Sequence, residues 1–239
     1  MAQFVVRLCR CVLHLVAAIM LMTAVIFTIT AIVTPAWQVV DYSQLHELHH
    51  HGLWETCVKG GASNLNLQGR TDEWICVFRE EQPKDDLTIN YHAMQNWHLT
   101  TLGLLGASIF FGVLGTVFAM VSSAIDCCNY RMCFRVCAIV WMILHTLAAL
   151  LDAIAIIVFV RFSYDTKNRF IMQVNVRYEQ EWGYSFWSGV TSCIIYAISL
   201  MVAIGVLVFT FALVSRERHE YTKVHRDALY TMHAKHSTV

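Results

Sequence analysis

Four long apolar segments constrain the fold of this chain more than any other feature. They lie near residues 12–33, 99–124, 136–160 and 186–214. An α-helix rises about 1.5 Å per residue, so about 20 apolar residues are enough to cross the hydrocarbon core of a bilayer. Each segment reaches that length. The sequence therefore predicts an integral membrane protein with four transmembrane helices, in contact with membrane lipids.

The overall composition agrees with a membrane protein and excludes other classes. Hydrophobic residues make up 57% of the 239 residues and charged residues only 14%, whereas soluble domains are about a quarter charged. So apolar a chain is not intrinsically disordered. Its 17 basic residues are balanced by 17 acidic ones, so no excess of positive charge is present to bind nucleic acid.

The first apolar segment has some features of a signal peptide, because Arg7 and Arg10 precede it. Its apolar run is longer than the hydrophobic region of a signal peptide, and no small-residue cleavage site follows it. We therefore expect an uncleaved first span.

The positive charges of the connecting segments predict the orientation. Nine of the 17 Lys and Arg lie in the short N-terminal segment, in 125–135 and in 215–239, whereas the other eight are spread over the longer segments 34–98 and 161–185. The side with the denser positive charge faces the cytosol. The sequence predicts a multi-pass plasma-membrane protein with cytosolic termini, a cytosolic loop at 125–135 and extracellular loops at 34–98 and 161–185.

The nine cysteines divide according to this topology. Cys57 and Cys76 lie in the first predicted extracellular loop, where oxidising conditions favour one disulfide. Closing a loop of about 20 residues contributes roughly 3 kcal/mol in the chain-entropy model. Cys193 lies within the fourth predicted span, and six others lie at the cytosolic boundary: Cys9, Cys11, Cys127, Cys128, Cys133 and Cys137. For these, S-palmitoylation and burial as small apolar residues are two open alternatives.

The 34–98 segment has the pattern of a small β-sheet. Residues 37–42 alternate apolar and polar side chains, which is typical of a half-buried strand, and residues 74–78 predict a second, more buried strand. Glycine-containing turn motifs lie between them, at 60–64 and 68–69. Because two strands alone are marginally stable, we expect further strands or contact with the second loop.

Residues in both loops resemble a known family. Trp37, the run Gly52-Leu53-Trp54-Glu55-Thr56-Cys57 and then Cys76 resemble the W…GLWxxC…C signature of the claudins and their peripheral-myelin-protein relatives. The second loop is similar to the E-x-G-x-S-φ-aromatic-x-G entry into the fourth span of that superfamily, with Glu181, Gly183, Ser185 and Gly189 at its fixed positions. The two motifs lie in the expected loops of the predicted topology.

The resemblance implies a membrane α-helical fold, a claudin-like bundle of four transmembrane helices with a small extracellular antiparallel β-sheet of five strands. Three features depart from the claudins. Eighteen residues separate Cys57 from Cys76, the stretch 93–98 lacks the usual arginine, and Val58 and Val77 lie where the family carries pore charges. These departures are compatible with a divergent member such as the nematode Clc-like group.

Two functional hypotheses follow from the resemblance. The first is a structural role at cell–cell junctions, in which the protein associates with itself or with related claudin-like proteins in cis and in trans and contributes to a paracellular barrier. The C-terminal Ser237-Thr238-Val239 fits a ligand of a PDZ-domain scaffold. The alternative is an auxiliary, gamma-type subunit of a channel or receptor in the same membrane, since such subunits share the fold and the signature.

Catalytic and metal-binding motifs are absent from the sequence. It contains no Walker loop, HExxH motif or nucleophile elbow. We therefore expect that the protein is not an enzyme and binds no cofactor. The cluster His46, His49, His50 and His51 suggests zinc ligands, but consecutive histidines point in different directions and no cysteine completes the set. We therefore predict no metal site.

Three further groups of residues suggest a function but have a simpler explanation. The loop acids Asp41, Glu55, Asp72 and Glu73 would favour cations if the loops lined a paracellular path, but a solvated acidic loop is the expected case. Asp152 is the one acid deep within a span, and we expect it to be neutral, protonated or hydrogen-bonded in the bundle interior and to serve packing. The tail has apolar residues spaced for one helical face, which we expect to lie on the membrane surface; they are Tyr221, Val224, Ala228 and Met232.

Overall fold

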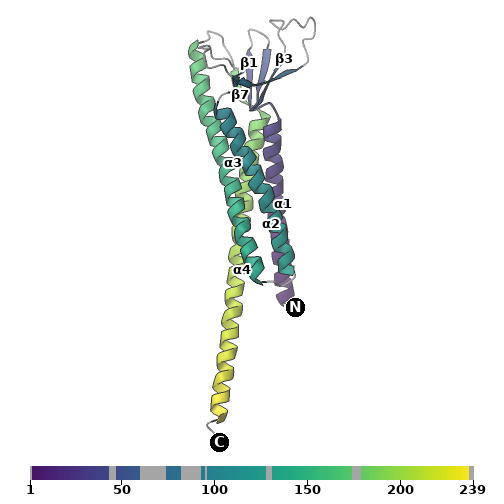
Figure 1. The fold of residues 1–239 in the computed structure, drawn as a ribbon, viewed down its shortest axis with the longest axis vertical. Helices are drawn as coiled ribbons and strands as arrows, with labels where there is room; N and C mark the ends of the chain where they lie inside the picture. Colours follow the sequence, from purple (N-terminus) through teal and green to yellow (C-terminus); the bar gives the residue numbers. More distant parts are fainter. Residues whose placement is uncertain are drawn as a thin grey trace.

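Four long helices form the bundle of this protein (Figure 1). The computed structural model describes residues 2–42, 47–59, 74–81, 93–94, 96–127, 131–173 and 179–236. The helices are α1 (Ala2–Val33), α2 (Asn96–Cys127), α3 (Arg131–Gln173) and α4 (Tyr184–His236). Each helix packs against two others, α1 against α2 and α4, and α3 against α2 and α4.

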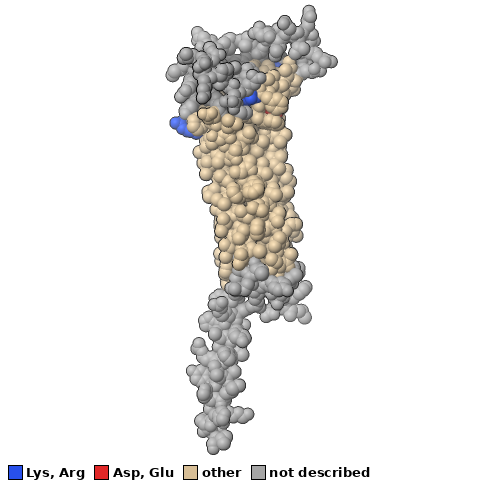
Figure 2. All heavy atoms as spheres, viewed as in Figure 1, with Lys and Arg blue, Asp and Glu red and all other residues tan. Residues whose placement is uncertain are grey.

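Each helix contains a stretch that is long and apolar enough to cross a membrane. These stretches are Cys11–Val33, Asn96–Ile125, Val136–Tyr164 and Tyr184–Phe209. On the face shown in Figure 2, the described surface of the bundle between its two ends carries no charged side chain. Many large apolar side chains of the four spans are exposed, which suits contact with the hydrocarbon of a bilayer. The chain is a multi-pass membrane protein.

All four helices are longer than the predicted spans, and α3 and α4 extend furthest past the predicted C-terminal ends. α3 continues to Gln173, into residues 161–185 that the sequence predicts as a loop, and α4 continues to His236, through nearly the whole predicted tail. Neither extension contains the glycine or proline that commonly ends a helix. The prediction that the tail lies on the membrane surface is wrong, because its helix continues along the direction of α4, away from the bundle (Figure 1).

Both loops contribute to one antiparallel sheet of five strands, in the order β4-β3-β2-β1-β7. Its strands are β1 (Gln38–Tyr42), β2 (Glu47–His51), β3 (Glu55–Lys59), β4 (Ile75–Phe78) and β7 (Glu179–Trp182). β7 comes from the second loop and pairs with β1, so the sheet has the five strands and the inter-loop contact that were predicted. A short parallel pair, β5 (Glu80–Glu81) and β6 (Ala93–Met94), lies outside it.

The sheet lies at one end of the bundle and both chain termini lie toward the other (Figure 1). The end of the bundle that carries the sheet is the sheet end, and the opposite end is the terminal end. At the sheet end, a buried cluster joins the sheet to all four helices; its members are Ala31, Trp37, Leu53, Leu105, Ala155, Phe159 and Phe186. The bundle therefore carries the sheet on a packed apolar base.

Candidate functional site

Trp37 is buried where the sheet meets the bundle. Its indole Nε1 donates a hydrogen bond of 2.7 Å to the carbonyl of Ala31, and its backbone N–H donates to the carbonyl of His51 at 3.2 Å. Its ring packs against Phe159 of α3 and Phe186 of α4, with centroids 4.5 and 6.3 Å away. One residue therefore joins α1, the sheet and two further helices.

Trp54 reaches the same helix end as Trp37. Its Nε1 donates to the carbonyl of Ile32 at 2.9 Å. Ala31 and Ile32 belong to the last four residues of α1, whose carbonyls have no partner within the helix. An unsatisfied backbone group at the edge of the hydrocarbon costs several kcal/mol. The two tryptophans of the signature therefore cap α1 while they hold the sheet.

Gly52 and Leu53 shape the turn between β2 and β3. A Cβ atom on Gly52 would lie 2.8 Å from the Cα of Pro35 and 2.9 Å from the carbonyl oxygen of Glu55, so a larger residue would force the backbone to move. The Gly52 N–H donates to that Glu55 carbonyl at 2.9 Å and closes the turn. Leu53 is fully buried in the cluster that contains Trp37.

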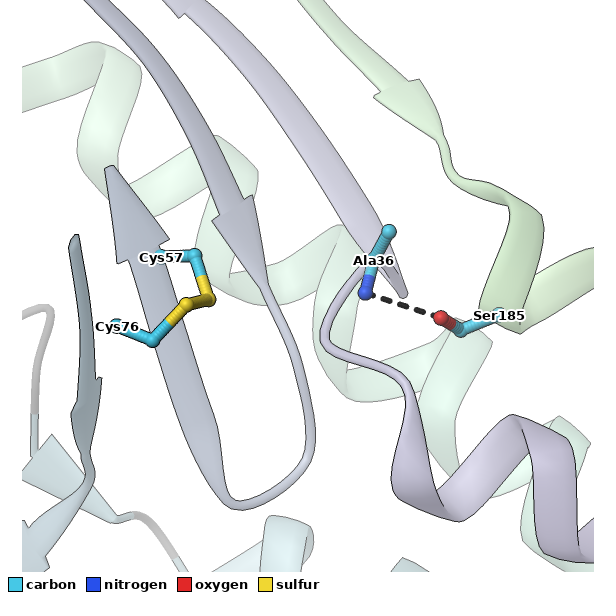
Figure 3. The surroundings of a disulfide bond; sticks show 4 residues. All are labelled: Ala36, Cys57, Cys76 and Ser185. Atoms are coloured by element: carbon cyan, nitrogen blue, oxygen red, sulfur yellow. Dashed lines mark hydrogen bonds between the residues drawn. A yellow bond between two sulfur atoms is a disulfide. The ribbon is translucent and has the colours of Figure 1, made fainter. Parts of the chain in front are cut away.

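The second motif docks on Ala36. A Cβ atom on Gly183 would collide with the Ala36 carbonyl oxygen, and the Gly183 N–H donates to the Trp37 carbonyl at 3.2 Å. The Ser185 Oγ accepts a hydrogen bond from the Ala36 N–H at 2.9 Å, which Figure 3 shows, and lies 3.1 Å from the Thr34 carbonyl, to which it can donate. The start of α4 is thereby joined to the segment that leaves α1.

The structure explains why the second motif has a glycine at position 189 but not why it has a glutamate at position 181. A Cβ atom on Gly189 would lie 2.9 Å from Ile156 Cδ1 and 3.4 Å from the ring of Trp37, so glycine leaves room for that ring. Glu181 is exposed on β7, opposite Val39. Within the described residues, no hydrogen bond or ion pair of its side chain explains its place in the motif.

A disulfide between Cys57 and Cys76 joins β3 to β4 at directly opposed positions (Figure 3). In the described sheet β4 is an outer strand and pairs only with β3. Its side chains are exposed on both faces, with 50% of Val77 and 65% of Phe78 accessible. The prediction that residues 74–78 form a more buried strand is wrong, because an outer strand has a neighbour on one side only.

The predicted acids do not gather at one place. Asp41 is exposed on β1 and lies opposite Glu179 of β7, with Glu181 two residues further on the same face. Glu55 lies on β3, two strands away, and Asp72 and Glu73 are outside the described residues. The structure thus places the carboxylates of Asp41, Glu179 and Glu181 along the β1–β7 edge. Of these, the sequence had suggested only Asp41.

The histidines of β2 do not form a metal site among the described residues. His49 and His51 share one face of the sheet, and His50 lies on the other, where its ring packs against Trp74 in a tilted arrangement with centroids 4.1 Å apart. Burial lowers the pKa of His50 from 6.5, which favours a neutral ring. Over the described part of the chain, no three His, Cys, Asp or Glu side chains are grouped to hold a metal ion. His46 lies outside it.

Two predicted sites lie wholly or partly outside the residues that the structure describes. Cys11 and Cys137 are half-buried thiols near the terminal end. The side chains of Cys9, Cys127 and Cys133, and the whole of Cys128, lie outside the described part, as do Ser237, Thr238 and Val239. S-palmitoylation and PDZ binding therefore stay predictions.

The connecting segment 34–36 was not singled out from the sequence. Thr34 and Ala36 nevertheless receive the second motif, and Pro35 lies against Gly52. The available clue was a proline directly after a predicted span, since proline lacks the N–H that continues a helix. It indicated where α1 ends but not what binds there.

Comparison with known proteins identifies the family. Residues 11–216 match the model of the family described as Clc-like, a stretch that holds all four spans, both motifs and the disulfide. The chain belongs to the Clc-like family. It is similar to Clc-like protein 2 of Caenorhabditis elegans, with 24% identity over 192 residues, which are 78% of this chain and 72% of that protein. The predicted divergent, nematode-type claudin-like protein is confirmed, in a family of non-enzymatic membrane proteins.

Proposed function

We propose that this Clc-like protein acts at cell–cell contacts, where its sheet binds copies of itself or related proteins in the same and in opposing membranes. The observation that carries the proposal is the outer strand β4. It combines exposed apolar side chains on both faces with one edge that is unpaired in the described sheet. Such an edge is a template for another strand, and an exposed apolar patch marks an interaction site.

The rest of the sheet supports this role because it holds β4 in a defined place. Trp37, Gly183 and Ser185 attach β1 and the start of α4 to the end of α1. The disulfide then ties β4 to β3. A partner that binds β4 therefore meets a preorganised surface, and less conformational entropy is lost on binding.

The proposed orientation places the sheet outside the plasma membrane and both termini in the cytosol. The disulfide at the sheet end needs an oxidising compartment. The terminal end carries the denser Lys and Arg, which favours the cytosolic side. Beyond Phe209 the α4 helix continues to His236, which at about 1.5 Å per residue is about 40 Å. This extension would present the C-terminal Ser237–Val239 to a PDZ scaffold well away from the lipid.

A contribution to a paracellular barrier belongs to the same proposal. Asp41, Glu179 and Glu181 place negative charge along the sheet edge opposite to β4. If assembled copies enclose a path between cells, these carboxylates would favour cations over anions. Exchanging Glu179 for Lys should then lower the Na⁺/Cl⁻ permeability ratio of an expressing monolayer, and an unchanged ratio would exclude that residue from the path.

A cell-mixing experiment tests the proposal. Cells that adhere poorly are made to express the tagged protein, mixed with cells that express a second tag and with untransfected cells, and imaged. We expect enrichment where two expressing cells touch and none where an expressing cell meets an untransfected one. A uniform membrane distribution would contradict the proposal and favour the auxiliary-subunit alternative, which co-purification of a channel or receptor from the same membrane would then examine.

A further inference from the structure

Asp152 lies inside the membrane-spanning part of α3 and is fully buried. Its carboxyl group meets hydroxyl groups from two other helices. The Thr28 Oγ1 of α1 lies 3.2 Å from Oδ1, and the Ser192 Oγ of α4 lies 3.0 Å from Oδ2. One acid therefore joins three of the four helices.

Both hydroxyl groups also have a nearer acceptor. Thr28 Oγ1 lies 3.0 Å from the carbonyl of Ala24, and Ser192 Oγ lies 2.7 Å from the carbonyl of Gly189. A hydroxyl has a single proton to donate, so each of the two serves either its backbone carbonyl or the carboxyl group of Asp152. The shorter distances favour the carbonyls. In that arrangement an ionised Asp152 accepts no hydrogen bond from either hydroxyl.

No cation at this depth offsets a negative charge. Over the four spans, the one Lys or Arg is Arg161, nine residues further along α3 and thus about 13 Å toward the sheet end. His145 lies about 10 Å toward the terminal end on the same helix. An ionised carboxylate without a close partner is costly in a low-dielectric interior, and more so within a membrane.

Within the described spans, the other helices contribute no charged group toward Asp152. The titratable side chains near it on α4 are Cys193 and Tyr196, which are neutral as a thiol and a phenol. α1 contributes the Thr28 hydroxyl. On α2, the buried polar Ser108 donates its own proton to the Ala148 carbonyl at 2.9 Å.

We propose that Asp152 is a proton-binding site inside the bundle: it carries a proton as a neutral carboxylic acid and donates it to the hydroxyl oxygen of Thr28 or Ser192. Those hydroxyls then donate their own protons to the carbonyls of Ala24 and Gly189. Each of these three O–H groups has one acceptor in this arrangement, and the Asp152 carboxyl group places no charge in the hydrocarbon. The ligand of the site is a proton, and the resulting chain of hydrogen bonds joins α1, α3 and α4.

The position of this chain connects it to the sheet. Gly189, whose carbonyl accepts from Ser192, is the glycine that leaves room for the Trp37 ring. The protonated acid therefore holds the three helices together directly beneath the base on which the sheet is carried. This inference does not depend on what the sheet binds, so it can fail or succeed independently of the proposed function.

Infrared difference spectroscopy on the purified full chain in lipid nanodiscs tests the proposal. A protonated carboxyl group has a carbonyl stretch that is well separated from the bands of a carboxylate. At neutral pH, the spectrum of the wild type minus that of Asp152→Asn should show the acid band. The matched control is Glu179→Gln, at an exposed carboxylate of β7, for which the same subtraction should show carboxylate bands instead.

Two further measurements keep the test decisive. Ser192→Ala removes one acceptor of the acid proton and should move the acid band without abolishing it. If Asp152→Asn does not fold, solid-state NMR of wild-type protein with ¹³C-labelled aspartate reports the protonation of Asp152 without that variant. A carboxylate signal for Asp152 at neutral pH, by either method, would overturn the proposal.

Discussion

The two edges of the sheet differ in how they are held. At the β1–β7 edge, the Trp37 side chain donates to the end of α1, and the backbone of Ala36 bonds with Ser185 at the start of α4. At the other edge, β4 is held by its pairing with β3 and by one disulfide, and its apolar side chains are exposed. One edge fixes the sheet on the bundle, and the other is left available for a partner.

The largest effect on folding is expected at the anchored edge. Trp37→Ala removes a fully buried ring and the cap on Ala31, and loss of a buried aromatic side chain costs about 3–5 kcal/mol. We expect the variant to be retained inside the cell, as surface biotinylation would show. The matched control is Trp74→Ala, beside β4, whose ring is 41% exposed. Equal losses of surface protein for both variants would remove the distinction between the two edges.

The disulfide should come second. Cys57→Ser releases β4 from β3, and removing a native disulfide from a small extracellular domain typically costs about 2–5 kcal/mol. We expect strongly reduced surface delivery and a lower melting temperature of the purified protein. Cys137→Ser, a half-buried thiol of the terminal end, serves as the control and should behave like the wild type. Normal delivery of Cys57→Ser would show that β4 is held by its backbone pairing alone.

Ser185 allows a finer test of the anchored edge. Ser185→Ala leaves the Ala36 N–H without its side-chain partner, and a buried unsatisfied donor costs about 1–3 kcal/mol. The melting temperature should fall by less than in Trp37→Ala, while surface delivery largely persists. Ser188→Ala is the matched control. The Ser188 hydroxyl also donates to a backbone carbonyl of α1, that of Phe27, but this hydrogen bond is exposed. An equal decrease in melting temperature in both variants would mean that the Ser185 hydrogen bond stabilises the protein no more than the exposed one.

The smallest effect is expected from pH. Burial lowers the pKa of His50 below 6.5, so the unfolded chain binds more protons than the folded one once the pH falls through that value. The stability of the sheet should therefore decline modestly on acidification and be fully present above pH 6.5. His50→Phe keeps a ring against Trp74 and should weaken this decline in a series of melting curves. If the variant loses stability on acidification to the same extent as the wild type, groups other than His50 cause the loss.

The sequence predicts the spans well and the ends of the helices poorly, for a physical reason. Hydropathy indicates which residues can lie in the lipid, and so it predicts where a span ends. A helix can continue past that point, because it ends only where its backbone hydrogen bonding is interrupted or capped. The segments 161–173 and 215–236 are polar enough to leave the membrane but contain nothing that stops a helix. The predicted spans therefore end before α3 and α4 do.

The strands show the same limit at the level of side chains. The apolar composition of residues 74–78 indicated burial, but their place at the outer edge depends on the order of the strands, which composition does not encode. The run Glu47–His51 has weak strand propensity and becomes β2 because β1 and β3 pair with it on both sides. The resemblance named Trp37 and Trp54, yet their caps on α1 follow only from where the sheet is placed.

The most direct test of the account is the cell-mixing experiment repeated with one change at the outer edge. Val77→Glu places a charge in the exposed apolar strand β4, while Glu179→Gln changes another exposed position, at the anchored edge. Both variants should reach the surface at wild-type levels. We predict that enrichment at contacts between expressing cells is lost with Val77→Glu and kept with Glu179→Gln. Unchanged enrichment with Val77→Glu would contradict the assignment of β4 as the binding edge.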